Sequence, residues 1–255
     1  MKDLEDKVVI VAGGATGIGQ ATAKRLGSEG AKVLVGDLNA AGAEQTAAGI
    51  TDAGGVAESF TFDISDEGAC RDLVAAAKDR WGAVHGLYNV AADLSPQTLG
   101  RDSDVVNIPV DVLRRTLDVN LIGYFFTSRF AVPAIIESGG GSIVHTTSGT
   151  TAGHYEFPAY AAAKNGVISL SRHIAVAYGK QGVRSNAIDP GITMTQNQLD
   201  SVTEEEREGL LPLVRANRYG EPEEIAAVVA FLISGEAPWI NGQTLPVNSM
   251  PWGAK

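Results

Sequence analysis

Tyr160 and Lys164, in the stretch AYAAAKNG at 159–166, lie four residues apart. On a helix this spacing places both side chains on one face, about one turn apart. A tyrosine hydroxyl keeps its proton to about pH 10, but a nearby ammonium stabilises the phenolate and lowers that pKa. At about 4 Å and an effective dielectric near 20, a unit charge pair interacts by roughly 4 kcal/mol, which is worth up to roughly 3 pKa units. The pair could therefore be a general base that works near neutral pH, or an ordinary helix face.

A second segment suited to chemistry is the glycine-rich stretch VVIVAGGATGIGQAT near the beginning of the chain. Gly13, Gly17 and Gly19 follow an apolar run and precede a helical pattern, at G-x-x-x-G-x-G spacing. Without Cβ atoms, these residues let the backbone turn tightly and approach a pyrophosphate, which the free N–H groups of the following helix would bind. Glycines also simply form turns, but their position in the first strand–helix unit favours dinucleotide binding.

Two aspartates end the next two apolar runs. Asp37 lies where a carboxylate accepts hydrogen bonds from the adenosine ribose hydroxyls and repels a 2′-phosphate. No Arg or Lys occupies positions 14, 15, 38 or 39, so the sequence predicts NAD rather than NADP as the cofactor. Asp63, in FDIS, could reach the adenine. Either aspartate could instead cap the helix that follows it.

Short apolar runs alternate with longer helical patterns along the whole chain. Such runs are typical of parallel strands covered on both faces. Strict alternation of this kind predicts a single α/β domain spanning 1–255, with a doubly wound, seven-stranded parallel sheet. The predicted strands are 7–13, 32–37, 58–63, 86–91, 142–147, 183–189 and 243–248, and the predicted helices are 18–29, 39–53, 67–81, 110–137, 159–179 and 222–234.

Two stretches, 93–109 and 192–218, break this alternation. Long irregular segments in a compact domain are usually functional loops. Both follow strand ends at the edge where sheets of this kind bind ligands. We therefore expect 192–217 to act as a lid over a substrate.

Composition and charge limit the classes of function. The 255-residue chain has a net charge of −10, which argues against nucleic-acid binding because such proteins neutralise phosphates with clustered Lys and Arg. No run of about 18 apolar residues is present, so no membrane span is expected. The charges in MKDLEDKVVIVAGG are unlike a signal peptide, and a cytoplasmic location is the expectation. Cys70 is the single cysteine and no cluster has zinc-site spacing, so neither an internal disulfide nor a metal is expected.

Taken together, these motifs resemble the short-chain dehydrogenase/reductase family, and the resemblance covers nearly the whole chain. It implies a Rossmann fold. The family's glycine motif corresponds to Gly13, Gly17 and Gly19, its acidic NAD selector to Asp37 and its adenine-binding aspartate to Asp63. Its N-N-A-G segment corresponds in part to Asn89-Val90-Ala91-Ala92, and its P-G motif to Pro190-Gly191. Its catalytic asparagine and serine correspond to Asn120 and Ser148, and its Y-x-x-x-K motif to Tyr160 and Lys164. Ile192 and Thr195 then hold the nicotinamide carboxamide, and the same expected cofactor site includes Thr16, Ile18, Leu38, Ile64 and Ala91.

The resemblance also implies roles for the catalytic residues, in hydride transfer between a nicotinamide and an alcohol or ketone. Tyr160 is then the general acid/base, and Lys164 stabilises its phenolate and binds the nicotinamide ribose. Ser148 holds the substrate oxygen, and Asn120 holds a water that relays the proton to solvent. From the residues alone, Asn120 could equally be a buried structural amide and Ser148 a turn residue.

The sequence departs from the family pattern at several positions. Ala12 stands where the family has a threonine, and Ala92 where it has a glycine. Ser148 lies 12 residues before Tyr160, where 13 is more usual, which suggests a shorter loop beside the substrate pocket. The C-terminal segment TLPVNSMPWGAK replaces a frequent Asp-Gly-Gly ending, so its subunit contacts could differ. None of these departures removes a catalytic side chain.

The expected substrate pocket combines 93–97, 149–157 and the 192–217 lid. His154 and Tyr155 follow the Ser148 strand and are candidates for contact with the substrate, although a spare histidine is more often structural. The apolar lining favours a neutral secondary alcohol or ketone, cyclic or aromatic, over a phosphorylated sugar. The expected apolar residues are Leu94, Tyr155, Phe157, Met194, Leu199, Leu210, Leu211 and Leu213.

The sequence also bears on the oligomeric state and on two alternative functions. Apolar stripes on 110–137 and 159–179, together with the family's usual helix pairing, imply a homotetramer, with a small-molecule substrate as the other partner. One rival function is an NADP-dependent 3-oxoacyl reductase, but Asp37 and the acidic net charge argue against binding NADP and an acidic acyl carrier. The other is a catalytically inactive NAD-binding regulator, which would not need the four intact catalytic residues.

Overall fold

A single parallel sheet forms the centre of the molecule. The computed structural model describes residues 1, 3–153, 156–196, 199 and 203–249. The strand order is β3-β2-β1-β4-β5-β6-β7, and every neighbouring pair is parallel. This confirms the predicted seven-stranded sheet. The strands are β1 (Val8–Ala12), β2 (Lys32–Asp37), β3 (Val56–Thr61), β4 (Gly86–Asn89), β5 (Gly141–Thr146), β6 (Val183–Asp189) and β7 (Thr244–Pro246).

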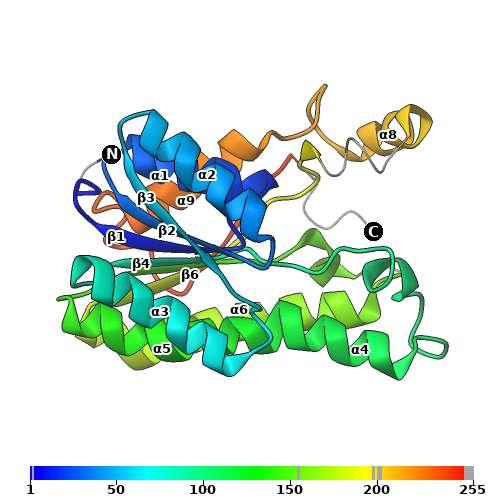
Figure 1. The fold of residues 1–255 in the computed structure, drawn as a ribbon. Helices are drawn as coiled ribbons and strands as arrows, with labels where there is room; N and C mark the ends of the chain where they lie inside the picture. The colour runs from blue at the N-terminus through cyan, green and yellow to red at the C-terminus, as the bar shows by residue number, and fades with distance from the viewer. Residues whose placement is uncertain (2, 154–155, 197–198, 200–202, 250–255) are drawn as a thin grey trace.

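Helices cover both faces of the sheet, as a doubly wound fold requires (Figure 1). One layer holds α1 (Gly17–Ser28), α2 (Ala40–Asp52) and α9 (Pro222–Ile233), and the other holds α3 (Glu67–Trp81), α4 (Val110–Leu117), α5 (Gly123–Glu137) and α6 (Pro158–Tyr178). Short helical turns are η1 (Leu99–Arg101), η2 (Asp118–Ile122), η3 (Gly149–Ala152), η4 (Gly179–Gln181) and η5 (Leu211–Leu213), and α8 (Glu204–Leu210) stands apart from both layers (Figure 1).

Two hydrophobic cores lie on the two faces of the sheet. In β1, Val8 and Ile10 pack toward α3, α5 and α6, whereas Val9 and Val11 pack toward α1, α2 and α9. Successive strand residues point to opposite faces, so a strand between two helical layers has apolar residues at every position. This is why the central strands were recognisable as continuous apolar runs.

In two segments, the observed secondary structure differs from the one that the sequence predicts. The predicted helix 110–137 consists of α4, a π-helical turn η2 and α5, because the backbone pairing shifts by one residue around Asn120. The segment 192–218, predicted to be irregular, contains α8 and η5. Val110–Glu137 is long and apolar enough to cross a membrane, but 56% of its apolar 18-residue window is buried inside the protein, as in core helices.

The beginning of α6 is capped by a residue from a distant loop. Phe157, which precedes the helix, has φ 63° and supplies no side-chain cap. Asp102 takes this role: its carboxylate oxygens accept hydrogen bonds from the N–H groups of Ala159 (3.2 Å) and Tyr160 (2.8 Å). The Asp102 side chain is only 1% exposed. The segment 93–109 is therefore tied directly to the helix that carries Tyr160 and Lys164.

We predict that Asp102→Ala lowers the free energy of unfolding by about 1–3 kcal/mol, because two buried N–H groups lose their acceptor. Urea unfolding followed by circular dichroism measures the change. Asp111→Ala is the control, since Asp111 is exposed and its surface ion pair with Arg101 should contribute less than about 1 kcal/mol. An Asp102→Ala protein as stable as the control would contradict the capping role.

Candidate active site

Three of the four predicted catalytic residues converge beside the end of β5. Tyr160 and Lys164 lie on one face of α6, and Lys164 Nζ is 5.5 Å from the centroid of the Tyr160 ring. Ser148 follows β5, and its hydroxyl lies close enough to Tyr160 to lower the pKa of the phenol. The fold thus joins residues of a strand end and a helix into one group, as predicted.

Lys164 is almost completely buried, with 1% of its surface exposed. Its ammonium donates to the Thr146 carbonyl oxygen (3.0 Å) and to the Tyr124 hydroxyl (3.2 Å). Burial lowers the pKa of Lys164 to about 7, because the charged form loses its hydration. A lysine of this kind can be switched between its charged and neutral forms near physiological pH.

The pKa of Tyr160 moves in the direction opposite to our expectation. Burial raises it above the ordinary value, the Asp189 carboxylate raises it further, and the interaction with Ser148 only partly opposes them. Lys164 does not outweigh these effects in the protein chain alone, because burial also disfavours its own positive charge. A phenolate at Tyr160 therefore requires positive charge beyond that of Lys164, such as an oxidised nicotinamide.

Asn120 lies in the π-helical turn η2, and π-turns of this kind are frequent at functional sites. Its amide nitrogen donates to the Thr116 carbonyl (3.1 Å), while its buried amide oxygen has no partner within the described residues. No hydrogen bond joins Asn120 to Ser148, Tyr160 or Lys164 in the part of the chain that the structure describes. The unpartnered oxygen is where a relay water would bind, since buried polar atoms are rarely left unsatisfied.

The glycine-rich turn between β1 and α1 is packed too tightly for side chains at two of its glycines. A Cβ on Gly13, which has φ 107°, would lie 2.4 Å from the Ala91 nitrogen, and one on Gly19 would lie 1.9 Å from the Gly13 oxygen. Thr16 precedes α1 without a side-chain cap, so the first N–H groups of the helix stay available for an anion. Thr16 and Ile18 flank this cradle, and its shape and free donors fit a pyrophosphate.

Asp37 occupies the position expected of a cofactor selector. Its carboxylate accepts hydrogen bonds from the N–H groups of Ala15 (2.9 Å) in the glycine turn and Asn39 (2.9 Å). The N-cap of α2 is Asn39, so the alternative in which Asp37 caps this helix is wrong. Leu38, beside it, is 62% exposed, which makes it available to cover an adenosine.

Asp63 is likewise not a helix cap, because Asp66 caps α3. Burial raises the pKa of Asp63, but hydrogen bonds from Ser65 and the positive charge of Arg115 outweigh it and hold the pKa below its usual value. Arg115 lies 3.8 Å from Asp63 and also contacts Asp93 at 3.3 Å. This arginine therefore links the end of the third strand to the segment after the fourth.

The remaining predicted cofactor residues surround the same edge of the sheet, with one exception. The side chain of Asn89 points into the core, where it accepts from Thr127 (2.8 Å) and contacts His145 (3.2 Å). It cannot contact a cofactor directly without breaking these bonds. Ile64 is buried at the end of the third strand, Ala91 borders the glycine turn, Pro190, Gly191 and Ile192 follow β6, and the Thr195 side chain lies beside Gly17.

The predicted substrate residues are only partly described. His154 and Tyr155 lie outside the described residues, as does the side chain of Leu213. Leu94 and Leu199 are exposed, and Phe157 and Met194 are half-buried. A cavity of about 240 Å³ at the base of the lid includes Pro190, Ile192 and Tyr219. Within the described residues, no group of three or more His, Cys, Asp or Glu could hold a metal.

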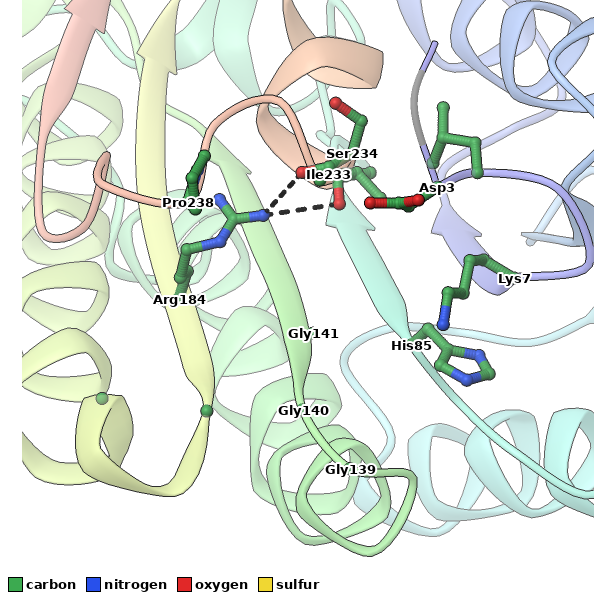
Figure 2. A pocket seen from close by; sticks show the side chains of 14 residues that line it. Asp3, Lys7, His85, Gly139, Gly140, Gly141, Arg184, Ile233, Ser234 and Pro238 are labelled. Carbon is green, nitrogen blue, oxygen red and sulfur yellow. Dashed lines mark hydrogen bonds between the residues drawn. The ribbon is translucent and has the colours of Figure 1, made fainter.

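Another cavity, of about 360 Å³, contains none of the predicted residues (Figure 2). It lies where β5 and β6 begin, between Asp3, Lys7, His85 and Arg184. The Arg184 guanidinium donates to the carbonyl oxygens of Leu232 (2.7 Å) and Ser234 (3.0 Å), so it closes the C-terminus of α9. This arrangement is structural and lies at the opposite edge of the sheet from Tyr160.

Sequence reasoning missed Asp102, Arg115 and Tyr124. Each acts on a residue more than 20 positions away, and nothing in the local sequence distinguishes it from its neighbours. Asp102 is one of several aspartates in a polar stretch, and Tyr124 belongs to an apolar helix pattern. Burial alone separates Asp102 from Asp104 and Asp111.

Comparison with known proteins agrees with this geometry. A family model described as enoyl-(acyl carrier protein) reductase matches residues 13–249. A 7alpha-hydroxysteroid dehydrogenase from Bacteroides fragilis is 33% identical over 97% of this chain and 95% of its own length. A cyclohexanol dehydrogenase from an Acinetobacter species is 33% identical over 95% of this chain and 94% of its own.

A solved structure has the same fold. A short-chain type dehydrogenase/reductase from Mycobacterium ulcerans superimposes with a TM-score of 0.90 at 26% identity, covering 98% of this chain and 90% of the other. The match in fold covers 98% of this chain. The protein therefore belongs to the short-chain dehydrogenase/reductase family, whose members are oxidoreductases that bind a nicotinamide cofactor.

Proposed function

We propose that this protein is an NAD-dependent dehydrogenase that interconverts a neutral secondary alcohol and its ketone, preferably a cyclic or aromatic one. The observation that carries the proposal is the convergence of Tyr160, Ser148 and Lys164 at the sheet edge that also holds the glycine turn. A regulator that only bound a dinucleotide would have no use for a buried, titratable lysine beside a tyrosine.

In the proposed mechanism, a nicotinamide dinucleotide held at the glycine turn would supply the hydride chemistry, and the side chains handle the proton. Ser148 donates a hydrogen bond to the substrate oxygen and holds it against Tyr160. Tyr160 removes the hydroxyl proton during oxidation and returns it during reduction. Lys164 stabilises the resulting phenolate by its charge and binds the ribose, while Asn120 orients a water toward solvent.

Asp37 supports NAD as the preferred cofactor. Its carboxylate is fixed by two backbone N–H groups at the edge of the glycine turn, where a ribose 2′-phosphate would meet like charge. The neighbouring positions 14, 15, 38 and 39 carry no Arg or Lys to attract that phosphate.

The relatives support a cyclic substrate. One is named for a hydroxysteroid and another for cyclohexanol, and both names describe alcohols on carbon rings. The exposed or half-buried Leu94, Phe157 and Met194 agree with an apolar pocket. We also propose that 192–217 forms a lid over the substrate, that the partner of the protein is a small molecule and that the protein is cytoplasmic.

The first experiment follows the absorbance of reduced cofactor near pH 9 with cyclic, aromatic and aliphatic secondary alcohols, each with NAD⁺ and with NADP⁺. We expect turnover with NAD⁺ on ring alcohols. A parallel assay follows NADPH oxidation with a 3-oxoacyl thioester, and turnover confined to that assay would favour the reductase of fatty-acid synthesis instead.

Tyr160→Phe should lower kcat at least about 100-fold while NADH still binds, because only the proton transfer is lost. Tyr178→Phe, on the same helix, is the matched control, and equal activity of both variants would refute the proposal.

Asp37→Asn tests the cofactor preference. The amide is nearly isosteric and keeps an oxygen that can accept from one of the two backbone N–H groups, but it removes the charge that repels a phosphate. We expect the ratio of kcat/KM for NAD⁺ to that for NADP⁺ to fall at least about tenfold, in line with roughly 1.4 kcal/mol of lost discrimination. Asp52→Asn, a surface residue at the end of α2, should leave the ratio unchanged. An unchanged ratio in Asp37→Asn would remove Asp37 as the selector.

We further propose that the protein is a homotetramer that pairs α4–α5 and α6 between subunits. Phe125 on α5 is 47% exposed and Val176 on α6 is 86% exposed, both large apolar side chains that an interface would cover. Light scattering after size exclusion should give four times the 26.6 kDa chain mass, and Phe125→Glu should reduce it. A wild-type monomer at micromolar concentration would contradict the tetramer.

A further inference from the structure

The Lys164 ammonium is buried without a compensating charge. Within the described residues, no carboxylate lies within 4 Å of it, and its polar contacts are one carbonyl oxygen and one phenol. Burying an unpaired charge is costly, and the usual outcome is that the group becomes neutral. Whatever keeps Lys164 charged must therefore come from these two contacts.

Tyr124 supplies one of them. It lies on α5, directly after the π-helical turn, and its side chain is completely buried. Its hydroxyl donates to the Ala91 carbonyl oxygen (3.1 Å) and so turns its lone pairs toward the Lys164 ammonium, 3.2 Å away. Lys164 Nζ also lies 4.7 Å from the centroid of the Tyr124 ring, within the range of a cation–π contact. The phenol thus contacts the ammonium through both its oxygen and its ring.

The other titratable groups around Lys164 do not replace this contact. Tyr160 on α6 is held protonated by burial and by Asp189 on β6. His145 on β5 stacks on the Tyr124 ring at 5.9 Å, and burial, together with the charge of Lys164, lowers its pKa to about 3, so it is neutral. Tyr124 itself keeps its proton, because burial raises its pKa well above the ordinary value. The environment of Lys164 is therefore made of neutral dipoles, and Tyr124 is the side chain among them that accepts a hydrogen bond from it.

We propose that Tyr124 is a positioning residue of the active site, whose buried hydroxyl holds Lys164 in its charged form and in place beside Tyr160. The inference deepens the proposed function and depends on it for its catalytic part. Lys164 Nζ lies 5.5 Å from the centroid of the Tyr160 ring, close enough that the charge on either group bears on the ionisation of the other. When the two side chains together have lost one proton, there are two possible arrangements. Either Tyr160 is a phenolate beside a Lys164 ammonium, or Tyr160 is a phenol beside a neutral Lys164 amine. Only the first arrangement can accept a proton from an alcohol through Tyr160, and the Tyr124 contact favours it.

Tyr124→Phe removes only the hydroxyl and keeps the ring. With lysine ¹³C-labelled at Cε, NMR titration of the apoprotein should give a Lys164 midpoint about one unit or more below that of the wild type, because the ammonium loses an acceptor. Lys164→Met assigns the signal. The matched control is Tyr88→Phe, which also removes a fully buried hydroxyl, one that accepts from Thr146 rather than from Lys164. An equal midpoint in wild type and Tyr124→Phe overturns the proposal.

Kinetics provide the second arm. In alcohol oxidation at high pH, Tyr124→Phe should lower kcat about tenfold and change KM less than about threefold, because substrate contacts remain while the competent ionic form becomes rarer. A packing role alone would lower the melting temperature and leave both values unchanged, which would overturn the proposal. Wild-type protein inactive on every alcohol would refute the proposed function, whereas the NMR arm would still test Tyr124.

A third measurement does not depend on the variant's folding. In wild-type protein labelled with ¹⁵N-lysine, the Lys164 ammonium protons should exchange slowly at pH 5.5 and show a nuclear Overhauser effect to the Tyr124 ring. Slow exchange follows from burial and two hydrogen bonds. A rapidly exchanging ammonium, or one without contact to this ring, would overturn the inference.

Discussion

Helix α6 is joined to the end of β5 by two reciprocal hydrogen bonds, and the geometry of the active site depends on them. The Thr147 hydroxyl donates to the Lys164 carbonyl (3.0 Å), and the Lys164 ammonium donates to the Thr146 carbonyl (3.0 Å). Asp102 fixes the beginning of the same helix. A helix held at both points cannot rotate or slide, so Tyr160 keeps its position relative to Ser148, which continues from the strand.

Burial of this junction decides its electrostatics. It raises the pKa of Tyr160 and lowers that of Lys164, so both groups are driven toward their neutral forms in the chain alone. In a site of low dielectric, a charge bound nearby acts more strongly than it would in water. The reactivity of the pair is therefore governed by what binds beside it and by the dipoles that hold the lysine, rather than by the two residues themselves.

The parallel register of the sheet brings the remaining parts of the site together. Ala12, Gly36 and Asn89 pair across three adjacent strands, so the turns that follow them lie at one edge. Gly13 approaches the Ala91 backbone too closely for any side chain at position 13. The Ala91 carbonyl oxygen in turn accepts a hydrogen bond from the Tyr124 hydroxyl. A continuous series of contacts thus links the glycine turn to Lys164. Replacing one member would shift the others, because a packed interior transmits strain.

The sequence by itself determined the seven strands, most of the helices between them and the spacing of Tyr160 and Lys164, whereas Ser148 joined this pair only through the resemblance to a known family. Strands buried on both faces need apolar residues throughout, and helix spacing places Tyr160 above Lys164, so these features are local. It could not determine that Asp102 caps α6, that Asn89 points into the core, or that Tyr124 contacts Lys164. Those contacts join residues far apart in the chain. Nor could it give the direction of the Tyr160 pKa shift, because desolvation depends on how deeply the whole fold buries a group, and only the tertiary structure decides that.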